Sequence, residues 1–402
     1  MVADAARRRL VANVFSLHLR LAGKAASQLA GEAPVVTRAI FLVVLGIATV
    51  GASCTTRIGE RRRMLVSPTL ELVDSLVLAE SDSLFVGDAS GFAAPADGTY
   101  LVSDKRNATL HQYEADGRHR RSLGRRGEGP GEWSFGPFRI VLGDDSLLLV
   151  TDGTSRIEVL SYPSGVPRAK RATQGRWFLA GYQGDRTYFA NIDRKKRSVI
   201  AATINGSDSS IYGGPYTAAI ARSSLVGELL SWMEIAILGG DTIAVASQSS
   251  DHIFVGPFPN GPFDSLRVPI AQRRGALPEL LSRIDDRNPS TVEQALYRPS
   301  YPLALHRLPS SGYLAYVTSD QTLVSSRMTG TIFVSVVDLN NHLACPDAEV
   351  VAPSDPLPRI AFRGDTLLVL VQDEDAHGAS RTSIRKFLID ASACAWQKAD
   401  AS

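Results

Sequence analysis

A short element recurs six times along this chain: a turn rich in Gly, Asp or Ser, followed by about six residues that are either continuously apolar or alternate between apolar and polar. The copies are roughly 40–70 residues apart, a spacing typical of propeller blades, each of which is a four-stranded sheet. Further apolar runs follow the copies and predict second strands. The six copies are "ADGTYLVSD" (96–104), "GDDSLLLVTD" (143–152), "GDRTYFANID" (184–193), "GGDTIAVASQ" (239–248), "SSGYLAYVTSD" (310–320) and "RGDTLLVLVQD" (363–373).

One blade cannot bury both of its faces, but blades stacked around an axis form a continuous core and leave only short sheet edges. The sequence therefore predicts an all-β fold, a six-bladed β-propeller spanning residues 71–402. A sandwich or two small β-domains would explain the six repeats less economically. The segments 279–284 and 291–299 contain helix formers and predict a short helical insertion between later blades.

The N-terminal region contains a fourteen-residue apolar run, residues 39–52, which is too short for a membrane span of about 20 residues. It follows a basic residue and ends in "VGASC", which resembles the lipobox of bacterial lipoproteins, although Gly51 stands where that motif prefers an aliphatic residue. We therefore expect a leader and signal peptide over 1–53, lipidation at Cys54 and a tether over 54–70.

The region that precedes this signal is unusually long. A compact signal peptide would begin at Val35 or Val36, which suggests that translation starts there and that the upstream residues are not part of the protein. The alternative is a genuine amphipathic basic leader.

Two cysteines remain after Cys54, and in an exported chain an even pair predicts a disulfide. A bond between Cys345 and Cys394 closes a loop of about 50 residues and would stabilise the fold by roughly 4 kcal/mol on chain-entropy grounds. The alternative is a pair of unrelated buried thiols.

The stretch "GRRGEGPGEWSFGPF", residues 124–138, invites comparison with a phosphate-binding loop. It lacks the third glycine of a dinucleotide loop and the Gly-Lys-Ser/Thr of a P-loop, and Pro130 lacks an N–H donor. Glycine reaches positive φ without cost and proline fixes its own φ, so Gly-Pro-Gly predicts a defined turn. We expect a crossover between two blades, after which Trp133, Phe135 and Phe138 return to the core.

Residues 104–133, "DKRNATLHQYEADGRHRRSLGRRGEGPGEW", resemble an NHL-type repeat, and their "GEGPGE" is similar to that of bacterial six-bladed β-propeller lipoproteins of largely unassigned function. The match covers one repeat, residues 96–138, in which Trp133 replaces the usual Phe. The resemblance implies a six-bladed, NHL-like propeller on an envelope anchor and does not imply a reaction.

Candidate ligand-binding residues follow from two patterns. Five of the repeated strands end in Asp, and strand ends of this kind can ring one mouth of a propeller channel and share a divalent cation or polar ligand. The alternative is that each aspartate caps its own turn. The basic stretch 117–126 could bind an acidic polymer or lipid headgroups, or be a solvated edge. From these patterns we take as candidates Asp104, Asp152, Arg125 and Arg126, beside Asp193, Asp320 and Asp373.

The formal net charge of +2 is too small to indicate nucleic-acid binding. The histidines show no metal-helix spacing, and no G-x-S-x-G motif is present. We therefore favour a monomeric, membrane-anchored binding or scaffold module of the cell envelope that needs no cofactor. Its partner would be an envelope protein or a small polar ligand. The alternative is a propeller hydrolase or lyase with a metal at the channel mouth.

Overall fold

The repeated turn-and-strand elements form the second strands of six antiparallel sheets, and the strands that follow them pair in simple meander order. In a computed structural model, the described residues belong to one unit, Met64–Ser402. They are residues 67–81, 84–143, 146–152, 156–172, 178–193, 195–204, 210–216, 233–276, 280, 288, 291, 294, 298–324, 327–350, 358–374 and 380–399. The predicted signal peptide and Cys54 lie outside them, as does most of the predicted helical insertion.

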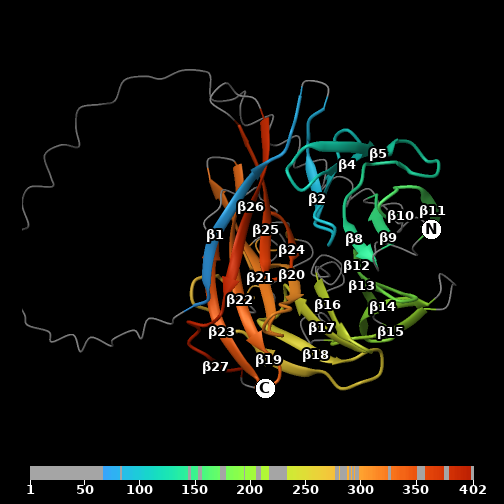
Figure 1. Ribbon diagram of the computed structural model, residues 1–402. Helices are drawn as coiled ribbons and strands as arrows, with labels where there is room; N and C mark the ends of the chain where they lie inside the picture. Colours follow the sequence, from blue (N-terminus) through green and yellow to red (C-terminus); the bar gives the residue numbers. More distant parts are fainter. Residues whose placement is uncertain are drawn as a thin grey trace, which may run out of the picture. The chain divides into compact units, whose positions relative to one another are not determined.

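Blades 1 to 3 are four-stranded sheets whose strands pair in chain order (Figure 1). Blade 1 consists of β2 (Ala89–Ala93), β3 (Tyr100–Asp104), β4 (Thr109–Tyr113) and β5 (His119–Leu123). Blade 2 consists of β8 (Ile140–Gly143), β9 (Leu147–Thr151), β10 (Arg156–Ser161) and β11 (Pro167–Ala172). Blade 3 consists of β12 (Phe178–Gln183), β13 (Arg186–Asp193), β14 (Ser198–Ile204) and β15 (Ser210–Gly213).

Blades 4 to 6 follow the same plan, with additions at the chain ends. Blade 4 consists of β16 (Met233–Gly239), β17 (Thr242–Ser247), β18 (His252–Pro257) and β19 (Asp264–Arg267). Blade 5 consists of β20 (Tyr301–Arg307), β21 (Leu314–Val324), β22 (Arg327–Asp338) and β23 (Leu343–Val350), and β27 (Gln397–Lys398) is added at its edge. Blade 6 consists of β24 (Arg359–Arg363), β25 (Thr366–Glu374) and β26 (Ser380–Asp390), with β1 (Thr69–Val77) as its outer strand.

The ring is closed by strands from opposite ends of the described chain. Strand β1 pairs antiparallel with β26, so the sixth blade combines N-terminal and C-terminal sequence, as Figure 1 shows for the blue and red strands. The innermost strands of the blades contact one another in cyclic order, β2, β8, β12, β16, β20 and β24, and β24 returns to β2. This arrangement is the six-bladed propeller that the repeats predict.

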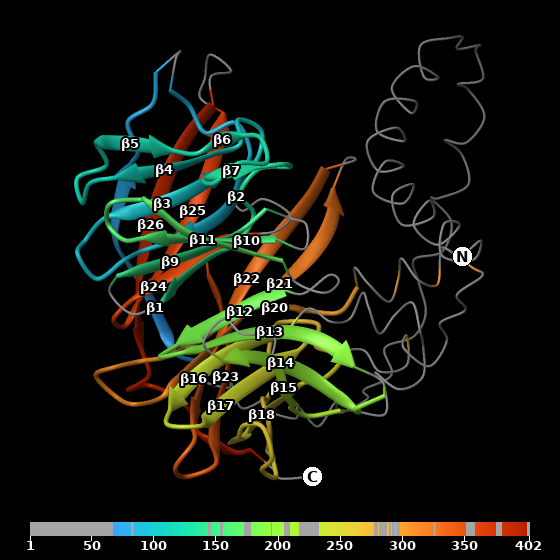
Figure 2. The same ribbon diagram turned by 90° about the vertical axis from the view of Figure 1, so that its right-hand side faces the viewer.

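The hydrophobic core lies between the blades. The described residues form six buried apolar clusters, and each cluster joins the facing sheets of two neighbouring blades. Blades 3 and 4, for example, share the cluster around Tyr188, Ile200 and Val245, and Figure 2 shows their sheets packed next to each other. Because the second strands lie between neighbouring blades and are buried on both faces, they read as nearly continuous apolar runs.

The C-terminal segment that follows β26 returns to blade 5. There β27 pairs with the edge strand β23, and a disulfide joins Cys345 on β23 to Cys394. The predicted disulfide is therefore present, and it ties the end of the last blade to its neighbour. Among the described residues, no helix is long and apolar enough to cross a membrane.

Candidate functional site

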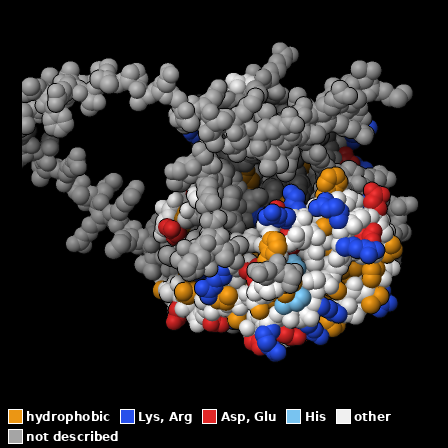
Figure 3. Space-filling view, turned by 90° about the horizontal axis from the view of Figure 1, so that it is seen from above, with side chains coloured by type: hydrophobic (Ala, Val, Ile, Leu, Met, Phe, Trp, Pro, Cys, Tyr) orange, Lys and Arg blue, Asp and Glu red, His pale blue; other side chains and the backbone are white. Residues whose placement is uncertain are grey.

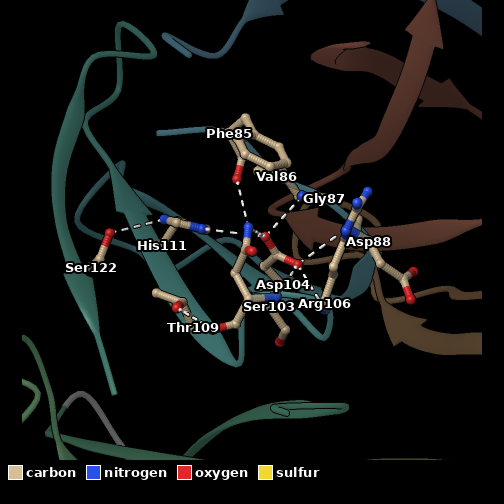
Figure 4. Close-up of polar contacts among 12 residues, drawn as sticks. Phe85, Val86, Gly87, Asp88, Ser103, Asp104, Arg106, Thr109, His111 and Ser122 are labelled. Atoms are coloured by element: carbon tan, nitrogen blue, oxygen red, sulfur yellow. Dashed lines mark hydrogen bonds and ion pairs between the residues drawn. The ribbon is translucent and has the colours of Figure 1, made fainter. Parts of the chain in front are cut away.

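Asp104, at the end of β3, is held by the loops around it (Figure 4). Its carboxylate accepts five hydrogen bonds: from the backbone N–H groups of Gly87 (2.8 Å), Asp88 (3.1 Å), Arg106 (2.9 Å) and Asn107 (3.2 Å), and from the Asn107 side-chain amide (2.7 Å). Burial by itself would raise the pKa of Asp104, but hydrogen bonds from neighbouring side chains and backbone amides outweigh it and hold the pKa below its usual value. Asp104 thus joins its own turn to the segment entering blade 1, as the turn-capping alternative predicts.

The other aspartates at strand ends also face protein groups. Asp193 accepts the N–H of Lys196 in its own turn at 2.9 Å, and Asp320 accepts the Ser300 hydroxyl at 2.5 Å and the N–H of Arg274 at 2.8 Å. Asp373 lies 4.0 Å from the Arg385 guanidinium. Asp152 is buried. The carboxylates of Asp193 and Asp320 therefore fasten a turn and a crossover.

Ser122, His111 and Asp104 lie on three successive strands of blade 1, and Figure 4 shows them in a row. A hydrogen bond of 3.0 Å joins His111 Nδ1 to Ser122 Oγ, but His111 Nε2 is 3.8 Å from Asp104 Oδ2. An activated serine needs a base within hydrogen-bond reach that is itself oriented by a third group. Ser122 Oγ is also only 3.1 Å from His119 Nε2, so this polar row links β4 and β5 and differs from a catalytic triad.

The glycine-rich stretch forms the predicted crossover from β5 to β8 and includes the short strands β6 (Arg125–Arg126) and β7 (Glu132–Trp133). The Gly129 N–H donates to Glu132 at 2.8 Å, and the Gly131 N–H donates to Glu158 at 3.3 Å. These amides are therefore occupied by the protein's own carboxylates. Gly131 has φ +73°, as expected for the turn, whereas Gly129 does not need a positive φ.

The aromatic residues that follow this turn behave differently from one another. Trp133 is completely buried between blades 1 and 2, as predicted. The same prediction is wrong for Phe135, which is 61% exposed, and Phe138 is only partly buried. Trp133 therefore joins the core at this blade junction, and Phe135, two residues further on, lies at the surface.

Arg125 and Arg126 lie on the outside of this crossover. Arg125 donates to Glu132 at 2.7 Å with its side chain 82% exposed, and Arg126 donates to the Ser134 carbonyl at 3.3 Å. In the coloured part of the face shown in Figure 3, Lys and Arg side chains are interspersed with acidic ones rather than forming one field. A ligand for this pair remains a prediction.

An ion pair between a half-buried arginine and a buried glutamate links two blades that are not neighbours. Arg139, just before β8, makes two hydrogen bonds to Glu234 on β16, at 2.6 and 3.0 Å. Since β12 lies between β8 and β16 in the ring, these side chains reach past an intervening blade. Burial raises the pKa of Glu234, and the paired guanidinium opposes that shift. The pair links blades 2 and 4 directly, in addition to the apolar blade contacts.

A pocket of about 300 Å³ lies where blades 5 and 6 meet the C-terminal segment. Three stretches of chain build it: the β20–β21 turn, the end of β26 with the turn after it, and the residue just before β27. Its polar and aromatic wall consists of Ser310, Ser311, Tyr313, Asp390, Ser392 and Trp396, and its apolar lining of Leu308, Ile389 and Ala391. A concave site of this volume with aromatic walls and several polar groups can take a small polar ligand.

Local hydrogen bonds hold these pocket residues. The Asp390 carboxylate accepts hydrogen bonds from the N–H of Ser392 at 2.8 Å and from its hydroxyl at 2.9 Å. These two bonds, the first from the N–H and the second from the hydroxyl, lower the pKa of Asp390. The Tyr313 and Trp396 rings are 4.9 Å apart, inclined at 62°. The wall therefore combines an ionised carboxylate with two aromatic rings in edge contact.

The sequence analysis did not single out this pocket, because its residues come from three turns distant in sequence. One signal was available: the predicted Cys345–Cys394 bond requires the stretch around Trp396 to lie against blade 5. Among the described residues, no group of three or more His, Cys, Asp or Glu side chains is arranged to hold a metal ion.

No known family matches the chain by sequence, and no curated protein does either. The fold is similar to solved structures. One is a member of the DUF4221 family from Bacteroides vulgatus, with 9% identity and a TM-score of 0.54 over 81% of this chain and 99% of that one. Another, from Bacteroides fragilis, is described as an exported protein and has 11% identity and a TM-score of 0.51 over 80% of this chain and 95% of that one. At sequence identities this low, the similarity shows a common fold only.

Proposed function

We propose that this chain is a binding module of the cell envelope, anchored by a lipid at Cys54, and that it takes up a small polar ligand in the pocket between blades 5 and 6. The observation that carries the binding function is the composition of that pocket, which combines a carboxylate, serine hydroxyls and two aromatic rings around about 300 Å³. The propeller supplies a rigid frame for it, because each wall belongs to a packed blade or is tied to one.

The anchor is supported by sequence. The apolar run before "VGASC" has the length of a signal-peptide core, and the cysteine is placed as in a lipobox. The exported neighbour from Bacteroides fragilis agrees with export of this chain. An acylated Cys54 would leave the propeller outside the membrane on a tether of about fifteen residues.

Two measurements test the proposal separately. Protein extracted from membranes should have an intact mass that begins at Cys54 and includes an acyl adduct, and Cys54→Ala should abolish both the adduct and membrane retention. A mature protein that begins elsewhere and carries no lipid would contradict the anchor.

Binding is tested on the processed protein by calorimetric titration with amino acids, monosaccharides and small ammonium compounds. We expect at least one of them to bind and Trp396→Ala to abolish that binding. Phe135→Ala, which removes an exposed aromatic ring from the distant crossover, is the matched control and should bind normally. Binding that survives Trp396→Ala unchanged would contradict the assignment of this pocket.

A further inference from the structure

We infer that the pocket beside Trp396 recognises an organic ammonium cation, an inference that rests on the proposed function and names its ligand class. The first ground is charge. Asp390 is the only charged residue among the described residues that line the pocket, and it is exposed. A second carboxylate, that of Asp365, lies behind the wall and accepts the Ser310 N–H at 3.3 Å. Both charges attract a cation.

Two basic residues lie near the pocket, and neither belongs to its lining. Arg307 precedes the lining residue Leu308, but its guanidinium donates to the carbonyl of Leu238 in blade 4 at 3.0 Å. Lys398 belongs to β27 and is not part of the lining. The described residues that line the pocket therefore carry one negative charge, which an ammonium ligand would balance.

The second ground is the arrangement of the aromatic rings. Tyr313 and Trp396 meet at 62° with their centroids 4.9 Å apart, so their faces form a corner rather than a flat platform. A flat ligand needs a whole open ring face to stack on, whereas a compact cation needs only to lie within about 6 Å of a ring centroid, over its negative face. Aromatic side chains arranged with a carboxylate are how proteins recognise quaternary ammonium groups.

The third ground is how firmly Trp396 is placed. The disulfide at Cys394 lies two residues before it, and Gln397, the next residue, pairs with Ala344 on β23. The Cys394 N–H also donates to the Ala391 carbonyl at 3.1 Å. Because the indole is held from both sides in the chain, little ordering entropy is lost when a ligand binds against it.

The test compares a cation with its uncharged isostere. Choline chloride and 3,3-dimethylbutan-1-ol have the same shape, and the second carries carbon in place of the charged nitrogen. In calorimetric titrations of the processed protein, we expect choline to bind at least about tenfold more tightly than the alcohol, the ratio expected when a charge interacts with two rings and a carboxylate. Asp390→Asn should remove most of that preference, since it keeps the side-chain size and loses the charge.

Aromatic variants complete the test. Trp396→Ala should abolish choline binding and Trp396→Phe should retain part of it, while Phe135→Ala should leave it unchanged. Circular dichroism and the absence of free thiols in each variant establish that the fold and the disulfide are intact. If the alcohol or glucose binds as tightly as choline and depends on Trp396, the cation assignment is wrong and the proposed binding function stands. If none of the panel binds, both are wrong.

Discussion

Replacing Gly124 by alanine adds one methyl group at the start of the glycine-rich crossover, and the structure indicates how costly that methyl is. Gly124 has φ +77°, a conformation that costs an L-residue about 1–2 kcal/mol. A Cβ at this position would also fall inside the indole ring of Trp133, which is fully buried at the blade 1–blade 2 junction. Overpacking of a filled core costs typically 1–3 kcal/mol more. We therefore expect a total loss of about 2–5 kcal/mol.

Gly364 provides the matched control. It has φ +59° in the β24–β25 turn, and a Cβ there would meet no heavy atom within 4 Å. Gly364→Ala should therefore lose only the conformational part, about 1–2 kcal/mol. The free energies of unfolding would be measured by urea denaturation with far-UV circular dichroism, and the difference between the two variants is the cost of displacing the indole.

A double-mutant cycle separates the clash from other effects. Trp133→Ala alone should lose about 3–5 kcal/mol because it leaves a large cavity. In that background the added methyl at Gly124 meets no ring, so the combined loss should be smaller than the sum of the single losses by at least about 1 kcal/mol. The reasoning fails if Gly124→Ala is no more destabilising than Gly364→Ala, or if the two losses at 124 and 133 simply add.

Three further outcomes are expected. Asp104→Asn should lose about 2–3 kcal/mol of unfolding free energy near neutral pH, because buried N–H donors lose their charged acceptor. The pKa of Asp104 is lowered in the fold, so its stabilisation is complete above the unfolded pKa of about 4 and is lost as the pH falls further. Acid unfolding curves of wild type and variant should therefore converge. Thiol labelling of unfolded, unreduced protein should not modify Cys345 or Cys394, and replacing both by serine should cost about 4 kcal/mol in urea unfolding. Arg139→Met should cost about 3–5 kcal/mol of unfolding free energy, because it leaves Glu234 buried and unpaired. Combining it with Glu234→Leu should restore most of the stability. Equal losses in the single and the double variant would contradict this account of the ion pair.

Much of the architecture could be predicted from local patterns. The turn-and-strand units of 96–104 and 363–373 show their apolar runs and their turn residues within ten positions of sequence, because strand formation depends on neighbours in the chain. The pairing of Cys345 with Cys394 followed from their number, since in an exported chain two remaining cysteines have one partner each. The burial of Trp133 could also be predicted locally, because it is an aromatic residue that directly follows the glycine-rich turn.

Other features required the folded chain. Phe135 is as apolar as Trp133, two positions earlier, yet it is exposed, because the path of the crossover decides which ring enters the blade junction. The strand-end aspartates look alike in sequence, but whether a carboxylate faces a ligand or a backbone amide depends on the loops that arrive from neighbouring blades, as Gly87 and Asp88 do at Asp104.

The sequence by itself determined the repeated strands, their number and the turns that separate them, because these depend on residues close together in the chain. Only the tertiary structure decided which blade receives each chain end and what lies at the blade junctions. The pocket brings together Tyr313, Asp390 and Trp396 from blade 5, blade 6 and the C-terminal segment. Closure of the ring through β1 and the return of β27 to blade 5 place these residues side by side. The first depends on contacts between residues hundreds of positions apart, and the second on a contact between the C-terminal segment and a neighbouring blade.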